Sequence, residues 1–158
     1  NELNLIHADP HPGNFLFQED GSLGIIDFGC VKRIPKKFYA VYFQLLNPDY
    51  HCDDEKLKAL YHKLEFLLES DDKETETLFF NIFKESMDLL IYPFTKETFD
   101  FADEKYFDRI YKKGEELSKS KDVRKGGKAR GSRHILYINR TYFGLFSILQ
   151  ELKAEIKS

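Results

Sequence analysis

The feature that most constrains this chain is a pair of polar clusters on either side of a short predicted hairpin. The first cluster is residues 7–14 (HADPHPGN) and the second is residues 26–29 (IDFG). Between them, short apolar runs flank Glu19-Asp20-Gly21, which is typical of a turn whose glycine takes a positive φ. Because a hairpin of this length brings its two ends together, we expect both clusters at one end of it.

Asp9, Asn14 and Asp27 are the side chains of these clusters that suit a hard cation. Two carboxylates and one amide oxygen match Mg²⁺, which keeps part of its water shell and also binds phosphate oxygens. Each residue alone is more often an ordinary turn residue. Their combination around one hairpin favours a functional interpretation, and it predicts a phosphoryl-transfer site.

At these positions the chain resembles protein kinases. Their catalytic loop reads H-R-D-L-x-x-x-N and is followed by D-F-G, and both patterns are matched here except that Ala8 replaces the arginine and Pro10 the leucine. Switching through a phosphorylated activation loop, which that arginine serves, is therefore not expected. The sequence of residues 7–14 resembles the UbiB/ADCK family of atypical kinase-like proteins. Residues 138–145 (INRTYFGL) are similar to that family's C-terminal helix.

The resemblance implies an α+β, mainly α fold: a kinase-like C-lobe with one small β-hairpin and about five helices. It implies that ATP and Mg²⁺ are the cofactors. Asn14 and Asp27 would bind the metal, and Asp9 and Gly29 would complete the nucleotide site. Asp9 would orient or deprotonate the phosphoryl acceptor.

Two histidines of the loop have different expected roles. We interpret His7 as structural, with a hydrogen bond to the backbone near Asp27. His11 occupies the place where protein kinases often have a phosphate-contacting lysine, so we assign it to the catalytic group, with loop packing as the alternative. Pro10 and Pro12 restrict the backbone before them and are expected to keep the loop extended and stiff.

The 158 residues suit one domain. Within it we expect residues 1–34 to form the loop, hairpin and DFG segment, residues 35–120 to be helical, residues 121–133 to be a basic flexible linker, and residues 132–156 to form a last helix. Nothing before Asp9 matches an ATP-covering lobe. We therefore expect that lobe to be absent from this chain, and activity to require the full-length protein.

Apolar spacing predicts helices over about 35–46, 54–68, 74–90 and 103–119. Asp53 or Asp54 is expected to cap the second of these helices. Acidic residues near the start of the third, including Asp71 and Asp72, are expected to face solvent.

The segment 121–133 is rich in Lys, Arg and Gly. It is either a solvated linker or a contact for anionic lipid head groups or substrate phosphates. The net charge of −3 and the lack of a base-stacking pattern argue against nucleic acid as a partner. In the last helix, Arg140 and Thr141 need partners if buried, and the family resemblance makes them structural or lobe-positioning residues.

Cys30 and Cys52 form no C-x-x-C motif, which is compatible with a reducing compartment. No apolar run approaches the roughly 18 residues of a membrane span, and no signal peptide opens the chain. The expected location is the cytoplasm, either free or peripheral at a membrane surface.

Three functions remain open. The first is an ATP-dependent phosphotransferase or ATPase of the UbiB type, whose family context is a lipid or isoprenoid-quinone precursor. The second is a small-molecule kinase of the aminoglycoside- or choline-phosphotransferase type, whose loops resemble His-Gly-Asp-Leu-His-Pro-Gly-Asn. Pro10 in place of leucine favours the first. The third is a catalytically silent nucleotide-sensing scaffold, against which the intact metal-site residues argue.

Overall fold

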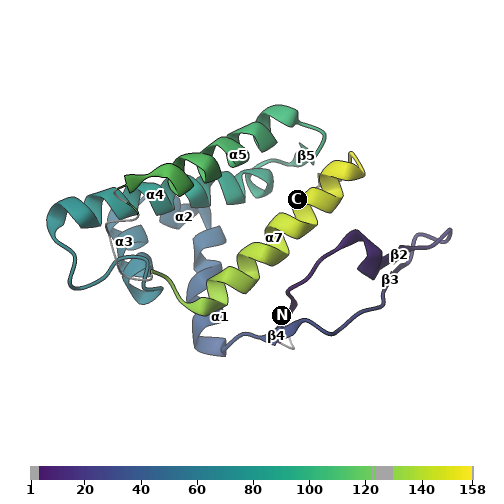
Figure 1. Cartoon of the computed structure of the whole chain (residues 1–158), viewed down its shortest axis with the longest axis horizontal. Coiled ribbons are helices and arrows are strands. Elements are labelled where there is room, and N and C mark those ends of the chain that lie inside the picture. The colour runs from purple at the N-terminus through teal and green to yellow at the C-terminus, as the bar shows by residue number, and fades with distance from the viewer. Residues whose placement is uncertain (1–3, 122, 124–129, 158) are drawn as a thin grey trace.

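The computed structural model describes residues 4–121, 123 and 130–157, and these residues are mainly helical with short strands. In chain order the elements are β1 (Leu5–His7), η1 (Pro12–Asn14), β2 (Phe15–Phe17), β3 (Leu23–Ile25), β4 (Val31–Arg33), α1 (Lys36–Tyr42), η2 (Phe43–Leu46), α2 (Pro48–His51), α3 (Asp54–Lys63), α4 (Lys73–Ile91), η3 (Tyr92–Thr95), β5 (Thr98–Asp100), α5 (Glu104–Lys119), α7 (Arg133–Glu151) and β6 (Glu155–Lys157). Figure 1 shows α4 and α5 side by side, α7 next to them, and the β2–β3 hairpin projecting away from the helices.

The strands of the described residues pair into three two-stranded antiparallel sheets. The β2–β3 pair is the predicted hairpin, with Phe15 opposite Ile25 and Gly21 at a φ of 80° in the turn. The other two sheets, β1–β4 and β5–β6, were not predicted. The β1–β4 pair joins the strand before the loop to the strand after the DFG segment, so it closes the base of the projecting hairpin.

Side-chain caps mark the starts of α3 and α4, near the starts that the sequence predicted. Asp53 Oδ1 accepts hydrogen bonds from the backbone N–H groups of Glu55 and Lys56, both at 3.1 Å. Asp72 Oδ1 accepts one from Thr75 N–H at 2.8 Å. These bonds satisfy backbone donors that have no partner inside the helix. Because the bonds favour the ionised carboxylate, they lower the pKa of both Asp53 and Asp72.

The predicted end of the second helix is wrong. Helix α3 ends at Lys63 instead of continuing to residue 68. Glu65 takes a φ of 62°, which breaks the right-handed helix, and Phe66 and Leu67 are buried in the turn that follows. Their apolar side chains reach the core from a loop. Apolar spacing that continued past Lys63 therefore did not indicate a continuing helix.

Two other boundaries differ from the expectation. Pro48 was expected to end the first helix, but it begins the short helix α2, where Asn47 Oδ1 caps Asp49 N–H at 3.0 Å. At the C-terminus, α7 ends at Glu151 instead of residue 156. The chain then turns through Lys153, at a φ of 48°, so that β6 can pair with β5.

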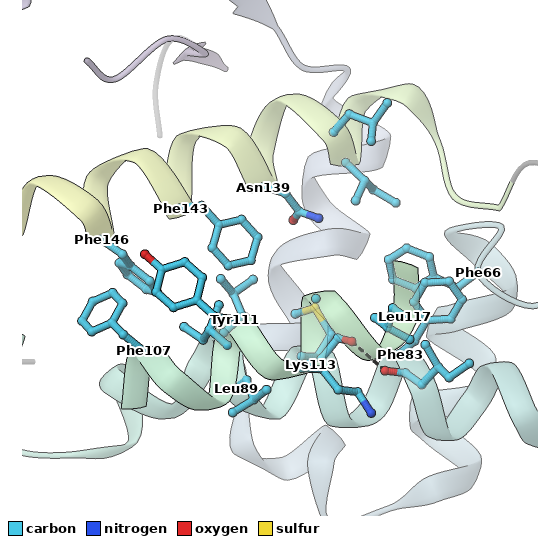
Figure 2. Close-up of a pocket in the computed structure, with 18 of the residues that line it drawn as sticks. Phe66, Phe83, Leu89, Phe107, Tyr111, Lys113, Leu117, Asn139, Phe143 and Phe146 are labelled. Carbon is cyan, nitrogen blue, oxygen red and sulfur yellow. Dashed lines mark hydrogen bonds between the residues drawn. The ribbon is translucent and has the colours of Figure 1, made fainter. Parts of the chain in front are cut away.

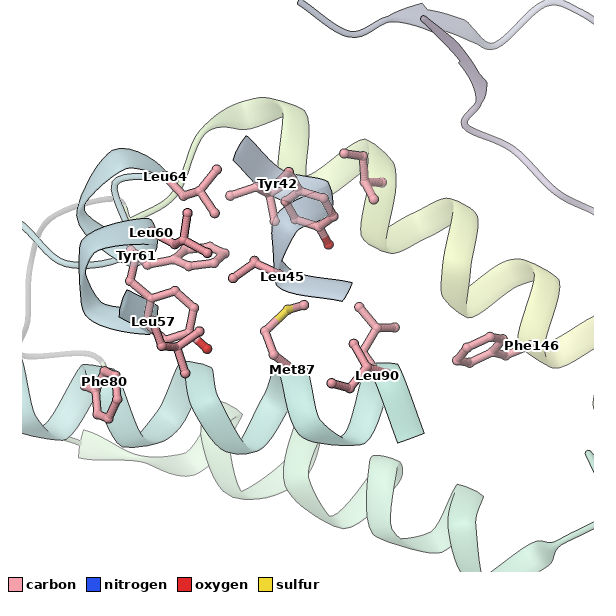
Figure 3. Close-up of a cluster of buried hydrophobic side chains, with 14 of the residues drawn as sticks. Tyr42, Leu45, Leu57, Leu60, Tyr61, Leu64, Phe80, Met87, Leu90 and Phe146 are labelled. Carbon is pink, nitrogen blue, oxygen red and sulfur yellow. The ribbon is translucent and has the colours of Figure 1, made fainter. Parts of the chain in front are cut away.

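The core lies among α1, η2, α3 and α4 (Figure 3). Its most deeply buried side chains include Tyr42, Leu45, Leu57, Leu60 and Tyr61. Burial of each large apolar side chain contributes about 1.5–3 kcal/mol. One side of α7 joins this core through Ile135, Ile138 and Phe146. The core therefore holds α7 in place.

No helix of the described residues is long and apolar enough to cross a membrane.

A buried ion pair connects the end of the basic segment to the loop before α4. Arg130 donates from its two terminal nitrogens to the Asp71 carboxylate at 2.6 and 2.7 Å, and both side chains are more than nine-tenths buried. The guanidinium also lies 3.5 Å from the centre of the Phe79 ring. The expectation that Asp71 faces solvent is therefore wrong. Within the basic segment, residues 122 and 124–129 lie outside the described residues.

Candidate active site

The loop between β1 and β2 is folded by hydrogen bonds within it. His11 N–H donates to Asp9 O at 2.8 Å, and Asn14 N–H donates to His11 O at 2.9 Å. Side chains add two more bonds: Asn14 Nδ2 donates to Asp9 O at 3.1 Å, and His11 Nδ1 accepts from Gly13 N–H at 3.1 Å. These bonds hold Asn14 next to the backbone of Asp9 and give His11 a role in loop packing.

Further hydrogen bonds attach this loop to the DFG segment. His7 Nε2 bonds to Asp27 O at 2.5 Å, which confirms the structural interpretation of His7. Ala8 N–H donates to Cys30 O at 2.8 Å, and Ile26 N–H donates to Asn14 O at 3.2 Å. The Ala8 side chain is fully buried at this junction, so an arginine there would have to displace its surroundings.

Each of the three predicted ligand residues uses one side-chain atom inside the protein. Asp27 Oδ1 accepts from Gly29 N–H at 2.7 Å, Asn14 uses its amide nitrogen, and Asp9 Oδ1 lies 3.2 Å from an Arg140 nitrogen. Within the described residues, the remaining oxygens, Asp9 Oδ2, Asn14 Oδ1 and Asp27 Oδ2, have no hydrogen bond or ion pair. Their coordination of a metal stays a prediction. The described residues also hold no cluster of three or more His, Cys, Asp or Glu side chains suited to a metal.

Helix α7 contacts the loop through two polar side chains, Arg140 and Thr141. The sequence indicated both residues but not their partners. Arg140 forms the ion pair with Asp9 Oδ1 at 3.2 Å, and both side chains are about half exposed. The Thr141 hydroxyl lies 3.0 Å from His7 O and 2.9 Å from Tyr137 O, to which it can donate. These contacts agree with a structural role for both residues, and they bring Arg140 directly to the predicted catalytic carboxylate. Lobe positioning stays a prediction.

Helix α7 approaches the loop closely at Gly144, a role that sequence reasoning missed. A Cβ at this position would lie 2.4 Å from Pro10 Cγ and 3.0 Å from Pro10 O. No real Cβ tolerates such a distance, and the proline ring cannot rotate away. A glycine in the middle of an amphipathic helix was the available signal, because it weakens the helix unless something packs against it.

A cleft of about 470 Å³ lies between the loop and α7. Its lining residues are Asp9, Pro10, Leu136, Asn139, Arg140, Phe143, Gly144 and Ser147. The cleft thus places the Asp9 carboxylate beside open space, and its α7 side combines apolar side chains with polar ones. Such a space suits a molecule that brings one polar group to the carboxylate.

Part of the chain is similar to a known family of kinase-like proteins. The model of the ABC1 atypical kinase-like domain family matches residues 2–61. Protein ACTIVITY OF BC1 COMPLEX KINASE 3, chloroplastic, of Arabidopsis thaliana is 39% identical over 70 residues, which are 42% of this chain and 9% of that protein. An uncharacterized aarF domain-containing protein kinase of the same plant is 57% identical over 30 residues, which are 19% of this chain and 4% of that protein.

A cyanobacterial protein shows the same extent of similarity. The uncharacterized protein sll0005 of Synechocystis is 39% identical over 75 residues, which are 45% of this chain and 10% of that protein. The chain therefore spans a tenth or less of the length of these curated relatives.

Proposed function

We propose that this chain supplies the catalytic loop and metal-binding half of an ATP-dependent phosphotransferase or ATPase. Residues 2–61 match the model of the ABC1 atypical kinase-like domain family, in agreement with the UbiB/ADCK resemblance. The observation that carries the proposal is the hydrogen-bonded junction of the two motifs, His7 Nε2 to Asp27 O at 2.5 Å. Two segments that in kinases act on the same phosphates are held together by this bond.

Asn14 Oδ1 and Asp27 Oδ2 are the proposed ligands of Mg²⁺. Both atoms lack a partner in the described residues, whereas the opposite atom of each side chain is held by a hydrogen bond. Mg²⁺ neutralises phosphate charge when it is bound with ATP. Because the described residues contain no larger acidic cluster, the metal is expected to bind together with the nucleotide and only weakly alone. Gly29, whose N–H orients Asp27, belongs to the nucleotide site.

Asp9 is the proposed residue that orients or deprotonates the acceptor hydroxyl. Arg140 holds its Oδ1 at 3.2 Å, so Oδ2 is the oxygen available to a substrate. His11 is a further contact for the transferred phosphate through Nε2, because its Nδ1 is occupied by Gly13 N–H.

The remaining parts of the site and its partners are proposed from the family context. A separate lobe would cover the ATP phosphates and pair with this chain. The acceptor would be a lipid or an isoprenoid-quinone precursor. Basic side chains of residues 121–133 would contact an anionic membrane surface, although Arg130 is excluded from this contact by its buried pairing with Asp71.

The test uses a protein that carries this segment together with the lobe that covers ATP. Asp27→Asn is expected to abolish Mg²⁺-dependent ATP turnover and to leave the circular dichroism spectrum unchanged. Asp20→Asn is the matched control, because it makes the same charge change at the hairpin turn, where Asp20 only caps Ser22 N–H at 2.9 Å. Unchanged turnover in Asp27→Asn would remove Asp27 from the metal site.

A second measurement addresses the claim that the chain is half of a site. Calorimetry with Mg-ATP on the 158-residue chain is expected to give very weak binding or none. Micromolar affinity would contradict the proposed division of the site between two lobes. If hydroxylated compounds are screened instead, steady phosphorylation of one small molecule would favour a small-molecule kinase, whereas slow ATP hydrolysis stimulated by lipid would favour the UbiB type.

A further inference from the structure

A large hollow in the described residues lies away from the loop, among α4, α5 and α7 (Figure 2). Its volume is about 740 Å³, which is within the usual range of small-molecule sites. Aromatic and aliphatic side chains dominate its lining, including Phe83, Leu90, Phe107, Ile110, Leu117 and Phe146. A ligand in this space would contact mainly apolar surface.

The two cationic side chains at the cavity are already neutralised by the protein. Lys113 donates to the Glu85 carboxylate. Arg130 forms its buried pair with Asp71. An anionic head group would therefore have to compete with an existing carboxylate at either position. This charge arrangement favours an uncharged ligand.

Asn139 gives the cavity one oriented polar group. Its Oδ1 accepts a hydrogen bond from the Tyr42 hydroxyl at 3.3 Å, and burial raises the pKa of Tyr42, so this hydroxyl keeps its proton. With Oδ1 fixed in this way, Nδ2 remains as the donor, and it has no partner among the described residues. Figure 2 shows the Asn139 side chain directed from α7 into the cavity.

We propose that this cavity binds an uncharged molecule with an apolar body and one hydrogen-bond acceptor, such as a carbonyl, which receives the Asn139 Nδ2–H. Four α7 residues that line the cavity, Leu136, Asn139, Phe143 and Ser147, also line the cleft beside Asp9. The polar end of the ligand would thus lie at the shared α7 wall. The proposal needs no metal or nucleotide, so it can be tested independently of the phosphoryl-transfer site.

Gly114 allows a test that fills the cavity without disturbing the core. It lines the cavity from α5, and an added Cβ would have no atom within 4 Å. We expect Gly114→Leu to weaken binding of Nile red, a neutral dye that fluoresces in apolar surroundings, by about tenfold. Gly114→Ala, which adds a single carbon at the same position, is the control and is expected to change binding by about twofold or less. Both variants should keep or raise the melting temperature.

Dye that binds to exposed apolar side chains elsewhere, such as Phe17 or Phe28, would be insensitive to Gly114→Leu. If Gly114→Leu melts normally and binds Nile red as tightly as the unmodified chain, the cavity is not the binding site and the proposal is overturned.

The ligand class is tested by displacement of Nile red with 2-dodecanone and with dodecanoate, which share a similar chain length. The ketone is expected to displace the dye, and the carboxylate is expected to displace it less effectively. Asn139→Asp keeps the acceptor for Tyr42 but replaces the Nδ2 donor, so it should weaken 2-dodecanone about fivefold or more. Ser147→Ala, whose hydroxyl bonds only to Phe143 O in its own helix, should have little effect. Tighter binding of dodecanoate, or no effect of Asn139→Asp on the ketone, would contradict the proposed ligand.

Discussion

The helical body and the loop–hairpin segment of this chain are held by different forces. In the body, Tyr42, Leu45 and Leu57 are fully buried, and aromatic rings pack against one another, as Phe66 and Phe83 do at 4.2 Å between centroids. In the segment, Phe17 and Phe28 are 64% and 65% exposed. The body therefore has a core of its own, and the segment has almost none.

This difference matters because the residues proposed to bind Mg-ATP all lie in the weaker region. An isolated two-stranded hairpin is at best marginally stable in water. The loop and hairpin depend on backbone hydrogen bonds, on the β1–β4 pair and on the contacts from α7. Helix α7 thus links the helical body to the site. Variants that separate these two regions test this account.

The largest effect is expected from the core. Leu57→Ala should lower the free energy of unfolding by about 2–5 kcal/mol, because it leaves a cavity among packed side chains. Phe17→Ala removes a larger side chain from the exposed hairpin and should cost about 0.5 kcal/mol or less. Urea denaturation of both variants measures the comparison. Equal losses would show that the hairpin is part of the core.

The next effect is expected at the contact between the two regions. Gly144→Ala places a Cβ against Pro10 and should cost about 1–3 kcal/mol, with faster hydrogen exchange at the Ala8 amide as the loop loses its support. Gly114→Ala is the matched substitution on a helix with open space, and it should stabilise the protein by up to about 1 kcal/mol. If Gly144→Ala is also stabilising, α7 does not pack closely against the loop at Pro10.

A smaller effect is expected from Thr141→Val. The variant keeps the shape of the side chain but removes the hydroxyl that lies 3.0 Å from His7 O, so about 1 kcal/mol should be lost. Ser147→Ala removes a hydroxyl that bonds only within α7 and should be nearly neutral. Thermal unfolding of the two variants measures the difference, and identical melting temperatures would remove Thr141 from the contact.

The smallest effect concerns acid. The pKa values of Asp53 and Asp72 are lowered from the ordinary value of 3.8 by hydrogen bonds from backbone N–H groups. Their stabilisation is therefore complete above that value and is lost as the pH falls through the folded-state pKa. Replacing both residues with asparagine should flatten the decrease in melting temperature below about pH 4. A decrease as steep as that of the unmodified chain would show that other carboxylates dominate.

The sequence predicted local features well and distant pairings poorly. The cap at Asp53 and the turn glycine Gly21 act within a few residues, so they were recognised correctly, and Asp72 was placed near a helix start although its capping role was not predicted. The end of α3 was misjudged because Glu65, not a glycine, adopts the positive φ there. A local pattern carries no sign of such an exception.

The site shows the same limit. The hydrogen bond of His7 to Asp27 O was expected from the motif. The pairing of Arg140 with Asp9 spans 131 positions, and the pairing of Arg130 with Asp71 spans 59, so no local pattern indicated either. Both depend on where the helical core places α7 and the residues before it.

The central claim, that Asn14 and Asp27 form one end of a metal-nucleotide site, is tested most directly by nuclear magnetic resonance of the 158-residue chain with Mn²⁺ and ATP. A paramagnetic ion broadens nearby signals even when binding is weak. The account predicts that the Asn14 side-chain amide and the Gly29 backbone amide broaden first, and that Asp27→Asn removes this effect. Strongest broadening at the acidic starts of α3 or α4, unchanged by Asp27→Asn, would contradict it.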